Sequence, residues 1–124
     1  MAATADARVF YRLSIRLPVS YQLAHGGAVP TGGAGSTLNL SAGGMLLQTS
    51  QPEETVVDEL LEDRSRIELE MHLGGRQLNI LSRLVWLEPT GTGGDDCTMG
   101  LRFLDLDTQE QEHIWEFVLQ NKAG

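Results

Sequence analysis

The sequence TLNLSAGGMLL, residues 37–47, places a short polar turn with two adjacent glycines between two apolar runs. Asn39 and Ser41 are two residues apart, so in an extended segment their side chains point to the same side. An amide and a hydroxyl offer donors and acceptors without charge, which suits the edge of a base or another planar polar ligand. Gly43 and Gly44 allow positive φ or the close approach of another group to the main chain. The alternative is a hairpin turn in which Asn39 and Ser41 bond their own backbone.

Strand patterns surround this turn on both sides. Residues 36–41 and 44–49 are expected to form two short strands that meet at the turn. Upstream, apolar and polar residues alternate over 13–21, which predicts another strand. Pro18 within it indicates an edge position or a bulge. Residues 24–36 are rich in glycine and predict a flexible loop.

The second half of the chain also carries strand patterns. Residues 66–73 alternate strictly between apolar and polar residues and predict a half-buried strand. Gly74-Gly75 is a two-residue hairpin signal. A returning strand is expected over 76–87 and a last strand over 98–103, after a glycine-rich acidic loop.

Two segments carry helical patterns. Residues 53–63 have apolar residues at helical spacing and predict a short helix, with a solvated loop as the alternative. Asp107 and Glu110 form a capping pair for a C-terminal helix that has an apolar face. Six strands at short spacing with one closing helix predict an all-β dominated fold, a small antiparallel barrel, because closure removes exposed strand edges.

The charge of the chain is unevenly distributed. The 124 residues suffice for one domain, with a loose tail expected over 1–7, and they carry a net charge of −8. Residues 1–52 sum to +2 and residues 53–124 to −10. Such an acidic chain would repel DNA or RNA, whose binding depends on neutralising phosphates. A small anion needs a local positive pocket, and only the N-terminal third offers one.

Two arginines make that N-terminal region distinctive. Arg8 and Arg12 are separated by three residues, and no acid lies between Ala7 and Pro52. Guanidinium groups form bidentate bonds to phosphate, pair with the O6 and N7 atoms of guanine and stack on base faces. Two solvated arginines are the alternative, since the spacing alone is a weak signal.

The combination of motifs is much more specific. Arg-x-x-x-Arg, then a strand, then Asn-x-Ser-x-x-Gly opening the third strand, in a chain of this size, resembles the PilZ domain family. In that family the second motif begins with Asp or Asn, so Asn39 fits. The resemblance covers most of the chain, including the Gly100–Phe103 strand and the terminal helix. It implies a six-stranded barrel over 8–124 and a bacterial receptor for cyclic di-GMP.

The resemblance also implies roles for individual residues. Arg8 and Arg12 would bind phosphate and guanine, with the N-terminal segment folding over the ligand. Asn39 and Ser41 would bond the edge of a guanine, and Gly44 would leave the space that the ligand needs. Gly43, Arg16 and Trp86 are possible additional contacts, although Arg16 fits a solvated position and Trp86 a core or rim position. Many members carry another Arg where this chain has Ala7, so its absence favours a single bound ligand over a stacked pair.

No pattern indicates an enzyme or a metal site. The three histidines and Cys97 lack metal-ligand spacing, and Ser41 has no base near it in sequence.

With no signal peptide, no membrane segment and one cysteine, the sequence predicts a cytoplasmic protein. It would regulate a protein partner in motility, biofilm formation or virulence through a ligand-induced change of the Arg8–Arg12 segment. The alternatives are a PilZ-like interaction module that binds no nucleotide, in pilus or motility assembly, and a small β-barrel enzyme or carrier.

Overall fold

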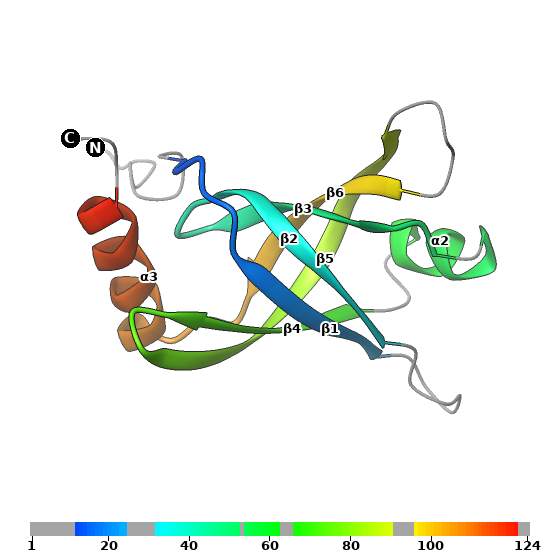
Figure 1. Cartoon of the computed structure of the whole chain (residues 1–124). Coiled ribbons are helices and arrows are strands. Elements are labelled where there is room, and N and C mark those ends of the chain that lie inside the picture. The colour runs from blue at the N-terminus through cyan, green and yellow to red at the C-terminus, as the bar shows by residue number, and fades with distance from the viewer. Residues whose placement is uncertain (1–11, 25–31, 53, 63–65, 91–95, 122–124) are drawn as a thin grey trace, which may run out of the picture.

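The computed structural model describes residues 12–24, 32–52, 54–62, 66–90 and 96–121. Within these ranges, six strands and two helices form the fold (Figure 1). In chain order they are β1 (Pro18–Ala24), β2 (Gly32–Leu40), β3 (Gly44–Ser50), α2 (Glu54–Leu61), β4 (Arg66–Leu73), β5 (Arg76–Thr90), β6 (Asp96–Leu104) and α3 (Thr108–Asn121).

The six strands close into a barrel. Their order around it is β1-β2-β3-β6-β5-β4, and every neighbouring pair is antiparallel. Closure pairs the first strand with the fourth, so no long strand edge is left among the described elements. The predicted all-β fold, a six-stranded antiparallel barrel with a C-terminal helix and a short helix near 53–63, is confirmed.

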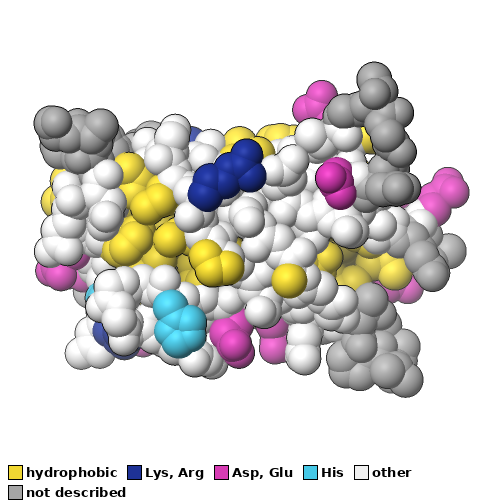
Figure 2. Space-filling model, viewed as in Figure 1, with side chains coloured by type: hydrophobic (Ala, Val, Ile, Leu, Met, Phe, Trp, Pro, Cys, Tyr) yellow, Lys and Arg dark blue, Asp and Glu magenta, His cyan; other side chains and the backbone are white. Residues whose placement is uncertain are grey.

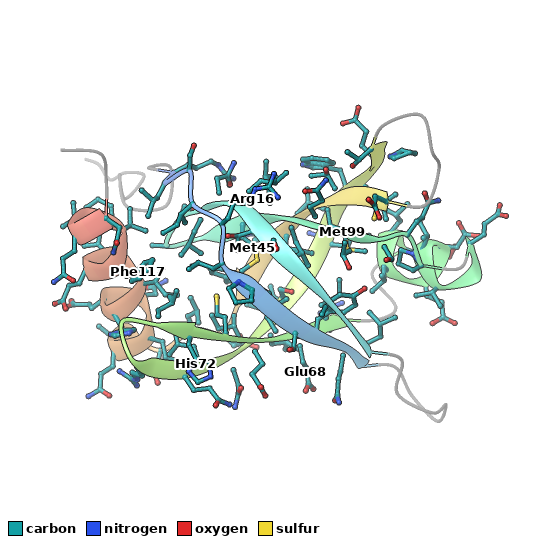
Figure 3. All side chains as sticks on the ribbon, viewed as in Figure 1. Arg16, Met45, Glu68, His72, Met99 and Phe117 are labelled. Atoms are coloured by element: carbon teal, nitrogen blue, oxygen red, sulfur yellow. The ribbon has the colours of Figure 1, made fainter. Side chains whose placement is uncertain are left out.

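The barrel interior is filled by the inward residues of the alternating strands. In β4 the inward positions are Ile67, Leu69, Met71 and Leu73, each buried, while the polar positions between them are partly or fully exposed. Figure 3 shows Met45 and Met99 within the barrel and Phe117 on α3. Burial of these apolar side chains is the main favourable contribution to folding.

The two helices lie at opposite ends of the barrel (Figure 1). Leu60 of α2 and Ile114 and Val118 of α3 are fully buried in the common core. The helices therefore cover the ends that a closed sheet leaves open. Among the residues described, no helix is long and apolar enough to cross a membrane.

The predicted local signals at the hairpin and at the last helix are confirmed. Gly74 and Gly75 have φ values of 57° and 83°, as a two-residue hairpin between β4 and β5 requires. The Asp107 Oδ1 atom accepts from the Glu110 N–H at 2.7 Å, and Glu110 Oε1 accepts from the Asp107 N–H at 3.2 Å. This is the reciprocal capping pair that stabilises the start of α3.

The predicted loop over 24–36 is wrong for its second part, because β2 begins at Gly32. Residues 25–31 lie outside the described part of the chain. The glycines of β2 reflect crowding, since a Cβ at Gly33 would meet the Tyr21 ring and one at Gly35 would meet the Gln48 carbonyl oxygen. Low β-propensity in the sequence therefore hid the start of a strand that has no room for a side chain at Gly33 or Gly35.

The predicted strand over 13–21 is shorter than expected, because β1 begins only at Pro18. Pro18 stands at the first position of its strand, where its missing N–H is tolerated. The preceding segment lies beside β2. The Thr37 N–H donates to the Leu17 carbonyl oxygen at 2.9 Å, and in an isolated bridge Leu13 and Leu40 exchange both backbone hydrogen bonds, at 2.8 and 2.9 Å. This bridge holds Arg12 next to the end of β2.

Candidate functional site

The first link between the two sequence motifs is a side-chain hydrogen bond. Arg12 Nη1 donates to Asn39 Oδ1 at 2.9 Å, across 27 positions of sequence. Arg12 is exposed and Asn39 is half-buried on β2. The structure therefore brings one arginine of the first motif to the opening residue of the second, while Arg8 lies outside the described residues.

Thr37 fixes the segment that carries Arg12. Its buried hydroxyl donates to the Ile15 carbonyl oxygen and accepts from the Leu17 N–H at 2.9 Å. A register shift between Thr37 and Asn39 leaves Leu38 without a partner on β3. Because of this bulge, Thr37 and Leu40 are both buried although they are three residues apart.

Replacing Thr37 with Val is expected to lower the free energy of unfolding by about 1–3 kcal/mol, because the Leu17 N–H then loses its acceptor. Urea denaturation followed by circular dichroism measures this loss. Thr37→Ser keeps the hydroxyl and serves as the control. Equal stability of the Val and Ser variants would show that the hydroxyl does not hold the segment.

Ser41 organises the turn between β2 and β3. Its hydroxyl is fully buried, accepts from the N–H groups of Gly43 and Gly44 at 3.2 Å each, and donates to the Gly44 carbonyl oxygen at 3.3 Å. The Ser41 N–H also donates to that carbonyl, at 2.9 Å. One donor and two acceptors exhaust a hydroxyl, so a direct bond from Ser41 to a ligand would replace a bond within the turn.

Gly44 has a packing reason to be glycine. A Cβ at this position would collide with the Leu101 carbonyl oxygen of β6. Neither Gly43 nor Gly44 has a positive φ. Close approach of the neighbouring strand, and not a special backbone conformation, accounts for the glycine at position 44.

A depression of about 450 Å³ lies beside the motifs. Arg12, the Ser41–Gly44 turn and the start of β3 form one side of it, and the β5–β6 pair forms the other. Its lining residues are Arg12, Ser41, Gly43, Gly44, Met45, Leu46, Val85, Trp86, Gly100, Leu101 and Arg102. Asn39 does not line the depression, but its side chain is hydrogen-bonded to Arg12, which does line it.

A bulge in β5 supplies the aromatic side of this depression. The register between β5 and β6 shifts between Leu84 and Trp86, and Val85 and Trp86 are both exposed, to 52% and 39%. The Trp86 indole lies against Gly100, where a Cβ would collide with it. Trp86 is therefore a rim aromatic with an accessible surface, the position at which a planar ligand can stack.

The depression is a local positive site on an acidic protein. Two arginines and no carboxylate are among the described residues that line it, whereas the whole chain has a net charge of −8. Figure 2 shows acidic side chains along β4 and near α2 on the face in view. A bound anion would gain favourable Coulomb energy here.

A second depression, of about 520 Å³, lies over β1, β2, β4 and β5. Glu68 and Glu70 line it, and the described lining residues include no Arg or Lys. Although it is the larger of the two, its carboxylates would repel an anion. The two depressions are therefore suited to ligands of opposite charge.

Arg16 does not join the site. It is exposed, and its Nη1 donates to Gln48 Oε1 at 2.9 Å instead of lining the depression. Within the described ranges, no group of three or more His, Cys, Asp or Glu side chains could hold a metal ion. Burial, together with the neighbouring Asp96 carboxylate, raises the pKa of the fully buried Cys97 thiol, which keeps it in its unreactive form.

The sequence reasoning missed Arg102 and Val85. The alternation of β6 marks Arg102 as an outward residue, and that signal was available in the sequence. Val85 becomes exposed only through the bulge, which alternation does not reveal.

Comparison with known proteins identifies the family. The family model described as PilZ domain matches residues 6–120. The PilZ domain of CeSA from a cellulose-synthesizing bacterium superposes with a TM-score of 0.57 at 19% identity, covering 89% of this chain and 96% of that one. The PilZ domain of YcgR from Escherichia coli, solved with c-di-GMP, gives a TM-score of 0.65 at 16% identity, with coverages of 89% and 87%.

A further solved structure extends the comparison. Borreliella burgdorferi PlzA in complex with c-di-GMP has a TM-score of 0.57 at 13% identity, covering 95% of this chain and 55% of that one. The comparison with curated proteins finds no match. Identities this low show the shared fold, and the family model assigns membership. This chain belongs to the PilZ domain family.

Proposed function

We propose that this protein is a receptor for cyclic di-GMP, which binds in the depression beside Arg12 and the Ser41–Gly44 turn. The observation that carries the proposal is the Arg12–Asn39 hydrogen bond of 2.9 Å. It joins the two motifs at the edge of a site lined by two arginines and no described carboxylate. The c-di-GMP in the structures of YcgR and PlzA supports the choice of ligand.

The chemistry of the ligand fits the lining. Cyclic di-GMP is a dianion with two guanine faces and acceptor edges. Arg12 uses one N–H for Asn39 and keeps most of its five donors for phosphate or guanine. Asn39 holds the guanidinium in place and offers its own amide N–H groups to an acceptor. Trp86 provides a face on which a base stacks.

Two glycines, Gly44 and Gly100, shape the surface of the proposed site. Gly44 lacks a side chain, so a flat ligand can approach the main chain of β3, and Gly100 makes room for the Trp86 indole beside it. Direct contact between the Ser41 hydroxyl and guanine remains a prediction. The turn bonds of Ser41 give a second reason for serine at this position, because they fix the N–H groups of Gly43 and Gly44.

The response to the ligand would pass through the N-terminal segment. Arg12 is joined to the barrel by the Leu13–Leu40 bridge, so a ligand bound to Arg12 and to Arg8 would order residues 8–12 against the depression. Ordering of a segment on binding changes the surface offered to a partner protein. The acidic α2 or the exposed side of α3 would be the partner face, and a pull-down with and without cyclic di-GMP tests this.

A thermal shift experiment tests the choice of ligand. At a free concentration of a hundred times Kd, cyclic di-GMP is expected to stabilise the fold by about 2.7 kcal/mol. For a domain of this size the melting temperature then rises by roughly 10 °C. GMP and GTP at the same concentration are expected to give much smaller shifts.

Other outcomes distinguish the alternatives. No shift with any nucleotide would favour an interaction module that does not bind nucleotide. A larger shift with GMP or GTP than with cyclic di-GMP would favour an enzyme or carrier of another ligand.

A further inference from the structure

Arg102 occupies a position in the site that neither motif contains. It lies on β6, between β3 and β5 in the barrel (Figure 1). Its cross-strand partners are Gly44 of the turn motif and Arg83 of β5. Arg102 is exposed and lines the same depression as Arg12.

None of the described strand neighbours of Arg102 on its face of the sheet is a carboxylate. Besides the cross-strand partners Gly44 and Arg83, the same-face positions along β6 are Gly100 and Leu104. Diagonal neighbours on this face are Leu46, Leu81 and Trp86, which are paired with Gly100 or Leu104. In a chain with seventeen acids and nine basic residues, a surface arginine so placed keeps its charge available for an anion.

Arg12 and Arg102 reach the depression from opposite sides of β3. Arg12 precedes the bridge to β2, which pairs with β3 on one side. Arg102 lies on β6, which pairs with β3 on the other. Three strand spacings, from the Arg12 segment to β2, β3 and β6, therefore separate the backbones from which the two guanidinium groups extend, roughly 14 Å in all. Between them, Gly44 leaves the surface without a side chain.

We propose that Arg102 is a further ligand-binding residue that contacts one phosphate of cyclic di-GMP while Arg12 contacts the other side of the ring. This inference rests on the function proposed above. A ring with two phosphates can engage guanidinium groups on both sides of β3 at once, whereas a nucleotide with one phosphate cannot. Arg102 would thus contribute to selectivity for the doubly charged ring as well as to affinity.

Calorimetric titration of cyclic di-GMP into wild type, Arg102→Gln and Arg76→Gln tests the inference. Arg76 is an exposed arginine at the start of β5 that lines neither depression, so its variant matches the change in net charge. Loss of a charged hydrogen-bond partner predicts roughly tenfold to hundredfold weaker binding for Arg102→Gln. Arg76→Gln is expected to stay within about twofold of wild type.

The salt dependence separates a direct contact from an indirect effect. Between low and high salt, wild-type affinity is expected to fall more steeply than that of Arg102→Gln, because the variant has one fewer ionic contact to screen. Arg102→Lys keeps the charge but loses the planar fork, and its affinity should lie between the two. Matching melting temperatures of the ligand-free proteins confirm that all variants fold.

The outcomes are distinguishable. If wild type binds and Arg102→Gln binds within twofold of it with the same salt dependence, the inference is overturned and the proposed function stands. If folded wild type binds no cyclic di-GMP, the proposed function fails and Arg102 has no such role.

Discussion

Replacing Arg12 with Ala is expected to weaken the binding of cyclic di-GMP by at least about a hundredfold. In the proposed complex Arg12 would supply charge-assisted hydrogen bonds to the ligand, and two such bonds contribute roughly 3 kcal/mol or more. The same substitution removes the bond to Asn39 and leaves that amide free to rotate. Because Arg12 is exposed, the stability of the ligand-free protein should change by less than about 0.5 kcal/mol. Calorimetric titration and thermal unfolding measure the two effects separately.

Arg16→Ala is the matched control for this experiment. Arg16 lies on the same segment and is also exposed, but it bonds Gln48 and does not line the depression. We expect the Arg16→Ala protein to lose no more than a few-fold in affinity for cyclic di-GMP. Equal losses for the two variants would mean that the segment contributes only general positive charge, which contradicts a specific contact from Arg12.

Replacing Gly44 with Ala is expected to lower the free energy of unfolding by about 1–3 kcal/mol, whatever its effect on binding. The new Cβ would collide with the Leu101 carbonyl oxygen, so β3 and β6 must separate locally. The collision is with backbone, which cannot rotate away as a side chain can. Urea denaturation of the ligand-free protein measures the loss.

Gly32→Ala provides the comparison for this substitution. Gly32 is also in a strand, and a Cβ there would lie 3.0 Å from the Tyr21 carbonyl oxygen, so a smaller loss is expected. A Gly44→Ala protein as stable as wild type would contradict the packing explanation.

Strands with strict alternation could be predicted from the sequence, whereas crowded strands could not. In β4 the alternation of Ile67–Leu73 with polar residues identified both the strand and its buried face. The start of β2 was missed because its glycines accommodate the Tyr21 ring and the β3 backbone, contacts between segments that no local pattern reveals. The apolar alternation over residues 13–17 similarly reflects packing beside β2, without continuous pairing.

The sequence motifs predicted only the part of the candidate site that the motif residues themselves form. The resemblance implied a common site for Arg12 and Asn39, and these two side chains are hydrogen-bonded. The buried Ser41 hydroxyl accepts hydrogen bonds from the backbone of its own turn, which matches the alternative prediction of a hairpin turn closed by its own side chains. Arg102 and Val85 were missed because their place in the site depends on the β6–β3 register and on a bulge in β5. Register and bulges arise from tertiary packing, so motif reading finds only part of such a site.

The most direct test of a shared anion site is an NMR titration of the ¹⁵N-labelled protein with cyclic di-GMP. We expect the amide resonances of Gly43, Gly44 and Arg102 and the indole N–H of Trp86 to shift together with one dissociation constant. Glu68 and Glu70, in the acidic depression, should not respond. Shifts confined to the acidic depression, or none at saturating ligand, would contradict a cyclic di-GMP site beside Arg12.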